Sequence, residues 1–113
     1  MTARNLRIFV GESTSFSGVV QRQDGSRVDL TDFTLTWKAG DKDFKRTAIS
    51  LTEGDGISIT NVTRGEWQID LRQKDTEELS RGLYVHEGFA ACAPKGENLS
   101  FVFGKLTLDG IIK

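Results

Sequence analysis

The residues best suited to chemistry lie side by side at His86 and Glu87, where the only histidine of the chain precedes a carboxylate. An imidazole beside a carboxylate is a common pair in general acid–base catalysis, and both groups also bind metals. Alternating apolar residues around them predict a β-strand, and neighbours on a strand point to opposite faces. The two groups therefore cannot act directly on each other. We expect His86 to be a strand-surface histidine without a catalytic or metal-binding role.

Acidic residues gather in three segments, and carboxylates in suitable pairs can bind calcium or hydrolyse glycosides. The three groups are Asp41 and Asp43, then Glu53 and Asp55, then Asp75, Glu77 and Glu78. None has EF-hand spacing, and acids in turns are usually solvated. Gly54 and Gly56 fit no phosphate-binding motif, and Asp55 between them would repel a phosphate, so a hairpin turn is the better interpretation. We predict no catalytic residue, no metal and no cofactor, and hence no enzyme.

Length and charge narrow the possible partners. The chain has 113 residues, which is the size of a single domain spanning residues 1–113. Fifteen Lys and Arg balance sixteen Asp and Glu without a block of either sign, which argues against a nucleic-acid partner. Cys92 is the one cysteine of the sequence, so an intrachain disulfide is excluded.

No apolar run approaches the ~20 residues of a membrane span, and the N-terminus lacks an apolar signal segment. We expect no membrane span and no export.

Alternation of apolar and polar residues dominates the chain and predicts short strands. Eight segments show it, at residues 6–10, 16–20, 33–37, 49–51, 57–59, 67–71, 83–91 and 99–108. The apolar phase of the last segment changes after Phe103, and a β-bulge at Gly104 would restore the core face. A capping-box pattern predicts one helical turn near residues 75–79.

Seven or eight short strands without a long helix predict an all-β, antiparallel β-sandwich, and two residues favour an immunoglobulin-like form. Trp37 lies on the third strand, where such folds often place a core tryptophan. Tyr84 opens the penultimate strand directly after the helical turn, as in a tyrosine corner. Trp67 is in phase with the aliphatic residues of its own strand. We therefore expect Trp37, Trp67 and Tyr84 to be structural residues of the core and its corner.

Several of these strand-and-turn segments resemble small virion modules of tailed phages, in particular the baseplate-upper-protein N-terminal-like group. The segments are Asp29–Asp32, Thr34–Trp37, Gly56–Thr60, Gly65–Leu71, Asp75–Thr76, Gly82–Glu87 and Gly104–Leu108. The resemblance covers about residues 14–108. It implies an immunoglobulin-like sandwich that assembles into, or decorates, a phage tail, baseplate or capsid. The implied location is the virion, and the host cytoplasm during assembly, with other virion proteins as partners.

The expected function is that of a non-enzymatic structural module of a phage or prophage particle, acting by self-assembly into a homo-oligomer and by docking. The first strand presents apolar residues in succession, as would suit pairing with a neighbouring chain. Candidate interface residues are Phe9 on that strand, Phe44 in the polar loop 40–46, and Ile111 and Ile112 near the C-terminus. An equally good interpretation is that these segments close the sheets of their own domain.

A small carbohydrate- or receptor-binding β-sandwich is the alternative function. In such a module, exposed tryptophan or tyrosine rings would stack on sugar rings. The tryptophans of this chain fall in phase with aliphatic residues, which favours the core over a surface platform.

Overall fold

The computed structural model describes residues 3–41 and 46–110, and most of them belong to strands or to the turns between strands. The strands are β1 (Leu6–Phe9), β2 (Thr14–Val19), β3 (Thr34–Gly40), β4 (Thr47–Glu53), β5 (Gly56–Asn61), β6 (Glu66–Leu71), β7 (Gly82–Cys92) and β8 (Glu97–Asp109). Each of the predicted strand segments corresponds to one of them. Helix α1 (Gln73–Thr76) is the one helix of the described residues.

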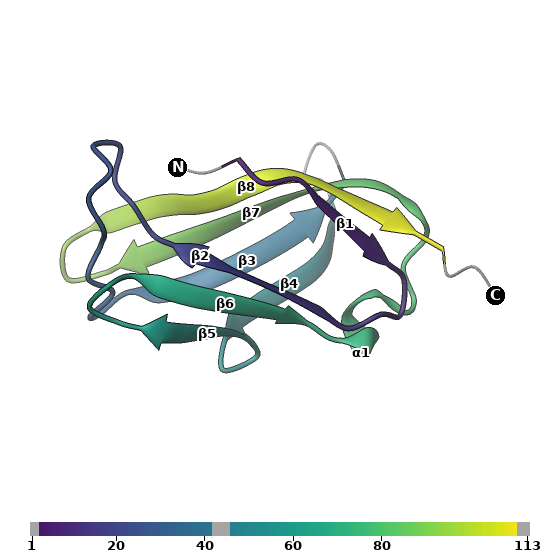
Figure 1. Cartoon of the computed structure of the whole chain (residues 1–113), viewed down its shortest axis with the longest axis horizontal. Helices are drawn as coiled ribbons and strands as arrows, with labels where there is room; N and C mark the ends of the chain where they lie inside the picture. The colour runs from purple at the N-terminus through teal and green to yellow at the C-terminus, as the bar shows by residue number, and fades with distance from the viewer. Residues whose placement is uncertain (1–2, 42–45, 111–113) are drawn as a thin grey trace.

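The strands form a sheet that folds into two layers (Figure 1). The large layer has the order β1-β8-β7-β3-β4, and the small layer has the order β5-β6-β2. The layers join where Thr52 and Glu53 of β4 pair with Gly56 and Ile57 of β5. Most pairings are antiparallel, as expected for the predicted sandwich, whereas β1 with β8 and β4 with β5 pair in parallel.

This strand order is that of an immunoglobulin-like sandwich. The run β3-β7-β8 corresponds to strands C, F and G, and the run β2-β6-β5 to strands B, E and D. The Tyr84 hydroxyl donates a hydrogen bond to the carbonyl of Ser80, at 2.8 Å, which is the tyrosine-corner geometry expected from the sequence. The fold is therefore the predicted all-β, immunoglobulin-like sandwich.

Aromatic rings fill the core between the layers. The ring of Phe16 on β2 meets Trp37 of the large layer edge-on, with centroids 6.0 Å apart, and Trp67 of its own layer at 5.8 Å. Trp67 in turn packs against Phe101 on β8 at 4.9 Å. Both tryptophans are buried, in agreement with their in-phase positions. Edge-to-face contacts of this kind add to the free energy gained by burying the rings.

The turn between β4 and β5 is not the predicted hairpin, because the two strands run parallel where they pair. Gly54 and Gly56 take φ values of 82° and 98°, which side chains other than glycine rarely adopt. These two residues let the chain pass from the large layer into the small layer within a few positions.

Strand β8 contains a β-bulge, but earlier than predicted. Its register with β7 shifts so that Val102 pairs with Gly88 while Ser100 pairs with Phe89, which leaves Phe101 as the extra residue. The Phe101 ring lies over Gly88, where a Cβ would approach its Cζ to 2.6 Å. The bulge therefore depends on the missing side chain at position 88. After it, Phe103 faces outward instead of continuing the predicted core row.

Helix α1 begins two residues before the predicted turn at 75–79. Asp75 occupies its third position, where the carboxylate accepts a hydrogen bond from the Arg72 backbone N–H at 2.8 Å. The buried Thr76 Oγ1 accepts a hydrogen bond from the Gly11 N–H at 2.9 Å. The helix is thereby tied to the turn between β1 and β2.

Candidate interaction surface

His86 lies in the core, with 1% of its surface exposed, and not on the strand surface as expected. The tyrosine corner turns Tyr84 inward, and every second residue of β7 after it faces inward as well. Small residues at Gly88 and Ala90 leave room for aromatic rings on this row. Glu87 points to the outer face, so His86 and Glu87 lie on opposite faces of β7, as predicted for neighbours on a strand.

Both ring nitrogens of His86 have partners. The Trp37 Nε1–H donates a hydrogen bond to Nδ1 at 3.1 Å, and Nε2 lies 2.6 Å from the carbonyl oxygen of Arg4. Because Nδ1 accepts, the proton of the neutral ring is on Nε2, which donates to Arg4. Burial lowers the pKa of His86, since the charged form would lose its hydration. The imidazole is thus a structural connector between strands.

Three of the clustered acidic residues, Glu53, Asp55 and Asp75, serve ion pairs and backbone contacts. Arg72 binds Asp55 at 2.7 Å and Asp75 at 3.0 Å, and its hydrogen bond lowers the pKa of Asp55. Glu53 accepts a hydrogen bond from the Leu35 N–H at 2.6 Å. In residues 3–41 and 46–110, no three His, Cys, Asp or Glu side chains are grouped to hold a metal.

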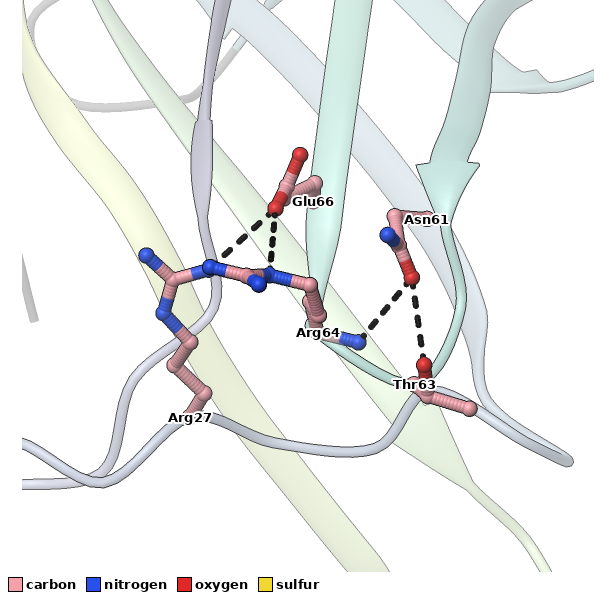
Figure 2. A network of polar contacts seen from close by, with 5 residues as sticks. All are labelled: Arg27, Asn61, Thr63, Arg64 and Glu66. Atoms are coloured by element: carbon pink, nitrogen blue, oxygen red, sulfur yellow. Dashed lines mark hydrogen bonds and ion pairs between the residues drawn. The ribbon is translucent and has the colours of Figure 1, made fainter.

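Charged groups at the turn between β5 and β6 also satisfy one another. Figure 2 shows Arg27 and Arg64 converging on the Glu66 carboxylate, at 3.2 and 3.1 Å. Next to them, Asn61 Oδ1 accepts hydrogen bonds from the Thr63 hydroxyl and the Arg64 backbone N–H. This network fixes the turn and leaves its two cations paired with an acid.

Exposed large hydrophobic residues of the strands lie on the outer face of the large layer, among polar neighbours such as Lys38, Glu87 and Lys105. Cross-strand partners share a face, so the register places Phe9, Leu83 and Phe103 together on the outside of the large layer. They are 36%, 57% and 36% exposed. Val85 and Phe89, both half-buried, point the same way. We call this surface, made of Phe9, Leu83, Val85, Phe89 and Phe103, the apolar face.

Polar side chains cover the outside of the small layer. Apart from Val19, its outward strand residues are Ser15, Ser17, Ser58, Thr60, Glu66, Gln68 and Asp70. The remaining exposed large hydrophobic residue of the described chain, Val62, lies in the turn between β5 and β6. Exposed apolar surface is therefore concentrated on one side of the sandwich.

A hollow of about 420 Å³ opens on the apolar face. Its walls include Val85 and Glu87 of β7 and Phe103 and Lys105 of β8, with Ala3 and Asn5 of the N-terminal segment at its border. Glu87 pairs with Phe103 and Val85 pairs with Lys105, so the four side chains form a rectangular block with one residue at each corner. The acid and the base occupy one diagonal of this block, and the two apolar residues occupy the other.

Of the predicted interface residues, the structure places Phe9 on the apolar face. Phe44, Ile111 and Ile112 lie outside the described residues. Strand β1 is an edge strand, as the apolar succession suggested.

Sequence reasoning missed Leu83, Val85 and Phe103 as surface residues. The tyrosine corner was the available signal, because an inward Tyr84 requires its strand neighbours Leu83 and Val85 to face outward. No such signal existed for Phe103, whose orientation depends on the bulge.

No protein-family model matches this sequence, and the curated proteins contain no match to it. Among solved structures, the chain is similar to the second Ig domain of the mouse polymeric immunoglobulin receptor, with 7% identity, a TM-score of 0.46 and coverage of 99% of each chain. A likeness of this size carries no argument about function. In the part of the chain that the structure describes, no helix is long and apolar enough to cross a membrane.

Proposed function

We propose that this chain is a non-enzymatic structural module that self-associates and docks to other proteins of a phage or prophage particle. The observation that carries the proposal is that Phe9, Leu83 and Phe103, the exposed large hydrophobic residues of the described strands, all lie on one outer face. Contiguous exposed apolar surface is uncommon on monomeric proteins and marks sites of protein association. A sandwich whose exposed phenylalanine and leucine side chains lie on one outer face is suited to contact a partner through that side.

The assignment to a phage particle is supported by the resemblance of the segments between residues 14 and 108 to tailed-phage virion modules. The site chemistry agrees with a structural role. His86 is enclosed in the core, and Asp55 and Asp75 share one arginine. These groups hold the fold together and do not face a common cleft.

A carbohydrate- or receptor-binding module is the second candidate, and the hollow on the apolar face is the observation in its favour. Phe103 offers a ring for stacking there, beside the polar side chains of Asn5 and Glu87. Trp37 and Trp67 are buried and offer no stacking surface.

Light scattering over a concentration series tests the proposed function. We expect the mass of the wild-type chain to rise above that of a monomer, and Phe103→Ser to raise the dissociation constant at least about tenfold, as loss of a central aromatic contact does. Val62→Ser removes an exposed hydrophobic residue away from the apolar face and should leave the constant unchanged. A wild-type protein that stays monomeric at the highest concentration, together with glycan-induced shifts of the Asn5 and Phe103 signals, would favour the alternative.

A further inference from the structure

We propose that the apolar face binds a second copy of this chain about a two-fold axis that runs along the Phe103–Val85 diagonal. The inference rests on the proposed function and specifies its surface and its partner. Homo-oligomers most often use two-fold symmetry, in which the same surface of both copies meets. The surface must then be complementary to itself.

The register of β7 and β8 provides this complementarity. A two-fold axis lying in the plane of the interface brings each residue on the axis into contact with the same residue of the second copy. A residue beside the axis instead meets the residue of the second copy that lies at the mirror position across the axis. With the axis through Phe103 and Val85, each of these apolar residues meets its counterpart. Glu87 then faces Lys105 of the second copy, and this contact occurs twice in the dimer.

The two charges are available for such contacts. Among the described residues neither Glu87 nor Lys105 belongs to an ion pair, whereas Arg7 and Asp109 at the end of the same face are paired with each other. Glu87 accepts only a long hydrogen bond from the Ser100 hydroxyl, at 3.4 Å. A surface with both an acid and a base beside apolar rings fits a copy of itself better than a partner of one charge sign.

The dimensions of the large layer set an upper limit on the area of this interface. Strand β7 has 11 residues, which correspond to about 37 Å at about 3.4 Å per residue. The spacing of about 4.8 Å between strands makes the large layer roughly 19 Å wide. The resulting area of about 700 Å² is that of the whole layer. Because the axis is oblique to β7 and β8, the strands of the two copies cross, and each copy buries less than this area and less than the roughly 800 Å² of a standard interface, as in a weak, concentration-dependent dimer.

Exchanging the two charges tests the axis directly. Glu87→Lys and Lys105→Glu should each raise the dissociation constant of the homodimer at least about tenfold, because both cross-contacts then join like charges. An equimolar mixture of the two variants should form a heterodimer of wild-type affinity, since every contact between these positions again joins an acid and a base. Native mass spectrometry of the mixture, with one variant isotope-labelled, distinguishes the heterodimer from either homodimer. Asp70→Lys makes the same change of charge on the polar outer face and should have no effect.

Three results would overturn the inference, and they differ in what they say about the proposed function. If the wild-type protein oligomerises and the single exchanges leave its affinity unchanged, self-association stands and this surface is wrong. If the exchanges weaken the dimer but the mixture does not restore it, the surface is right and the axis is wrong. If the wild-type protein is monomeric throughout, both the inference and self-association fail. Circular dichroism of each variant separates these outcomes from loss of fold.

Discussion

At the residue scale, the buried imidazole of His86 connects parts of the sandwich that are distant in sequence. It accepts a hydrogen bond from Trp37 of β3 and donates one to the carbonyl of Arg4 in the N-terminal segment. Gly104 pairs with His86 across β7 and β8, and a Cβ on it would lie 2.2 Å from the Arg4 carbonyl oxygen. The carbonyl can reach the imidazole because position 104 carries no side chain.

The stability of the fold should depend on the protonation of His86. Its pKa is lowered from 6.5 by burial, and a proton on Nδ1 would break the hydrogen bond from Trp37. Between the folded pKa and about 6.5, the unfolded chain therefore binds more protons than the folded chain. The free energy of unfolding has its full value above about pH 6.5 and decreases as the pH falls through this window. Urea unfolding between pH 5 and 8 measures this change.

The control for this titration is His86→Gln, whose stability should vary less with pH over the same range. Because the chain has one histidine, a single imidazole signal in the proton NMR spectrum reports the folded pKa. A value at or above that of a free imidazole would contradict the prediction.

At the element scale, the N-terminal segment closes the side of the sandwich where β1 and β2 are edge strands. The Arg4 N–H donates a hydrogen bond to the Phe103 carbonyl at 2.7 Å, and β1 continues alongside β8 in parallel. The Arg4 guanidinium crosses to the Ser17 carbonyl of β2 and lies 5.4 Å from the centre of the Phe16 ring. One residue thus contacts both layers and covers part of an edge that could otherwise pair with another strand.

The close approach of this segment to Gly104 can be tested with a matched pair of glycines. Gly104 and Gly82 have φ values of 156° and 155°, but a Cβ on Gly82 would meet no atom within 4 Å. Gly104→Ala should lower the free energy of unfolding by about 2–4 kcal/mol, because backbone strain and a clash with Arg4 add up. Gly82→Ala introduces the backbone strain without a clash and should lower the free energy of unfolding by about 1 kcal/mol.

Denaturant unfolding of both variants measures the difference, and hydrogen exchange of the Arg4 amide shows whether the segment has moved. Equal losses of stability in the two variants would mean that the contact between Arg4 and Gly104 contributes nothing.

At the scale of the whole molecule, the layers are held together by aromatic rings inside, and the exposed large hydrophobic residues of the described strands lie on one outer face. Phe16 contacts Trp37, Trp67 and His86, so its ring bridges both layers at the centre of the core. The external asymmetry follows from the orientation of β7 and β8, whose outward rows carry Leu83 and Phe103. The buried rings therefore contribute to stability, whereas Leu83 and Phe103 contribute to the exposed surface.

The difference between buried and exposed rings predicts losses of stability of different size for two phenylalanines. Phe16→Ala should lower the free energy of unfolding by about 3–5 kcal/mol, because the surrounding rings cannot shift to fill the cavity that it leaves. Phe9→Ala, on the apolar face, should cost less than about 1 kcal/mol of monomer stability. Thermal unfolding of dilute protein measures both changes in stability. A large loss of stability in the Phe9 variant at that dilution would mean that Phe9 contributes to the stability of the monomer as a core residue does.

Local patterns along the chain are enough to predict the strands and the residues that anchor them. Alternation is a property of neighbours along the chain, so the positions of β1 to β8, the burial of Trp37 and Trp67 and the corner at Tyr84 were all predictable. The same local argument placed His86 and Glu87 on opposite faces.

The inward row of β7 was signalled only by the tyrosine corner, and the positions of the bulge in β8 and of the parallel pairings had no local signal at all, so only the tertiary structure decided them. These features depend on residues far apart in sequence: the Phe101 ring occupies the space above Gly88, and the Arg4 backbone occupies the space above Gly104. Periodicity is the same for a strand and for that strand turned over. Contacts between layers select one of the two, and this selection buried His86 and brought Leu83 and Phe103 to the surface.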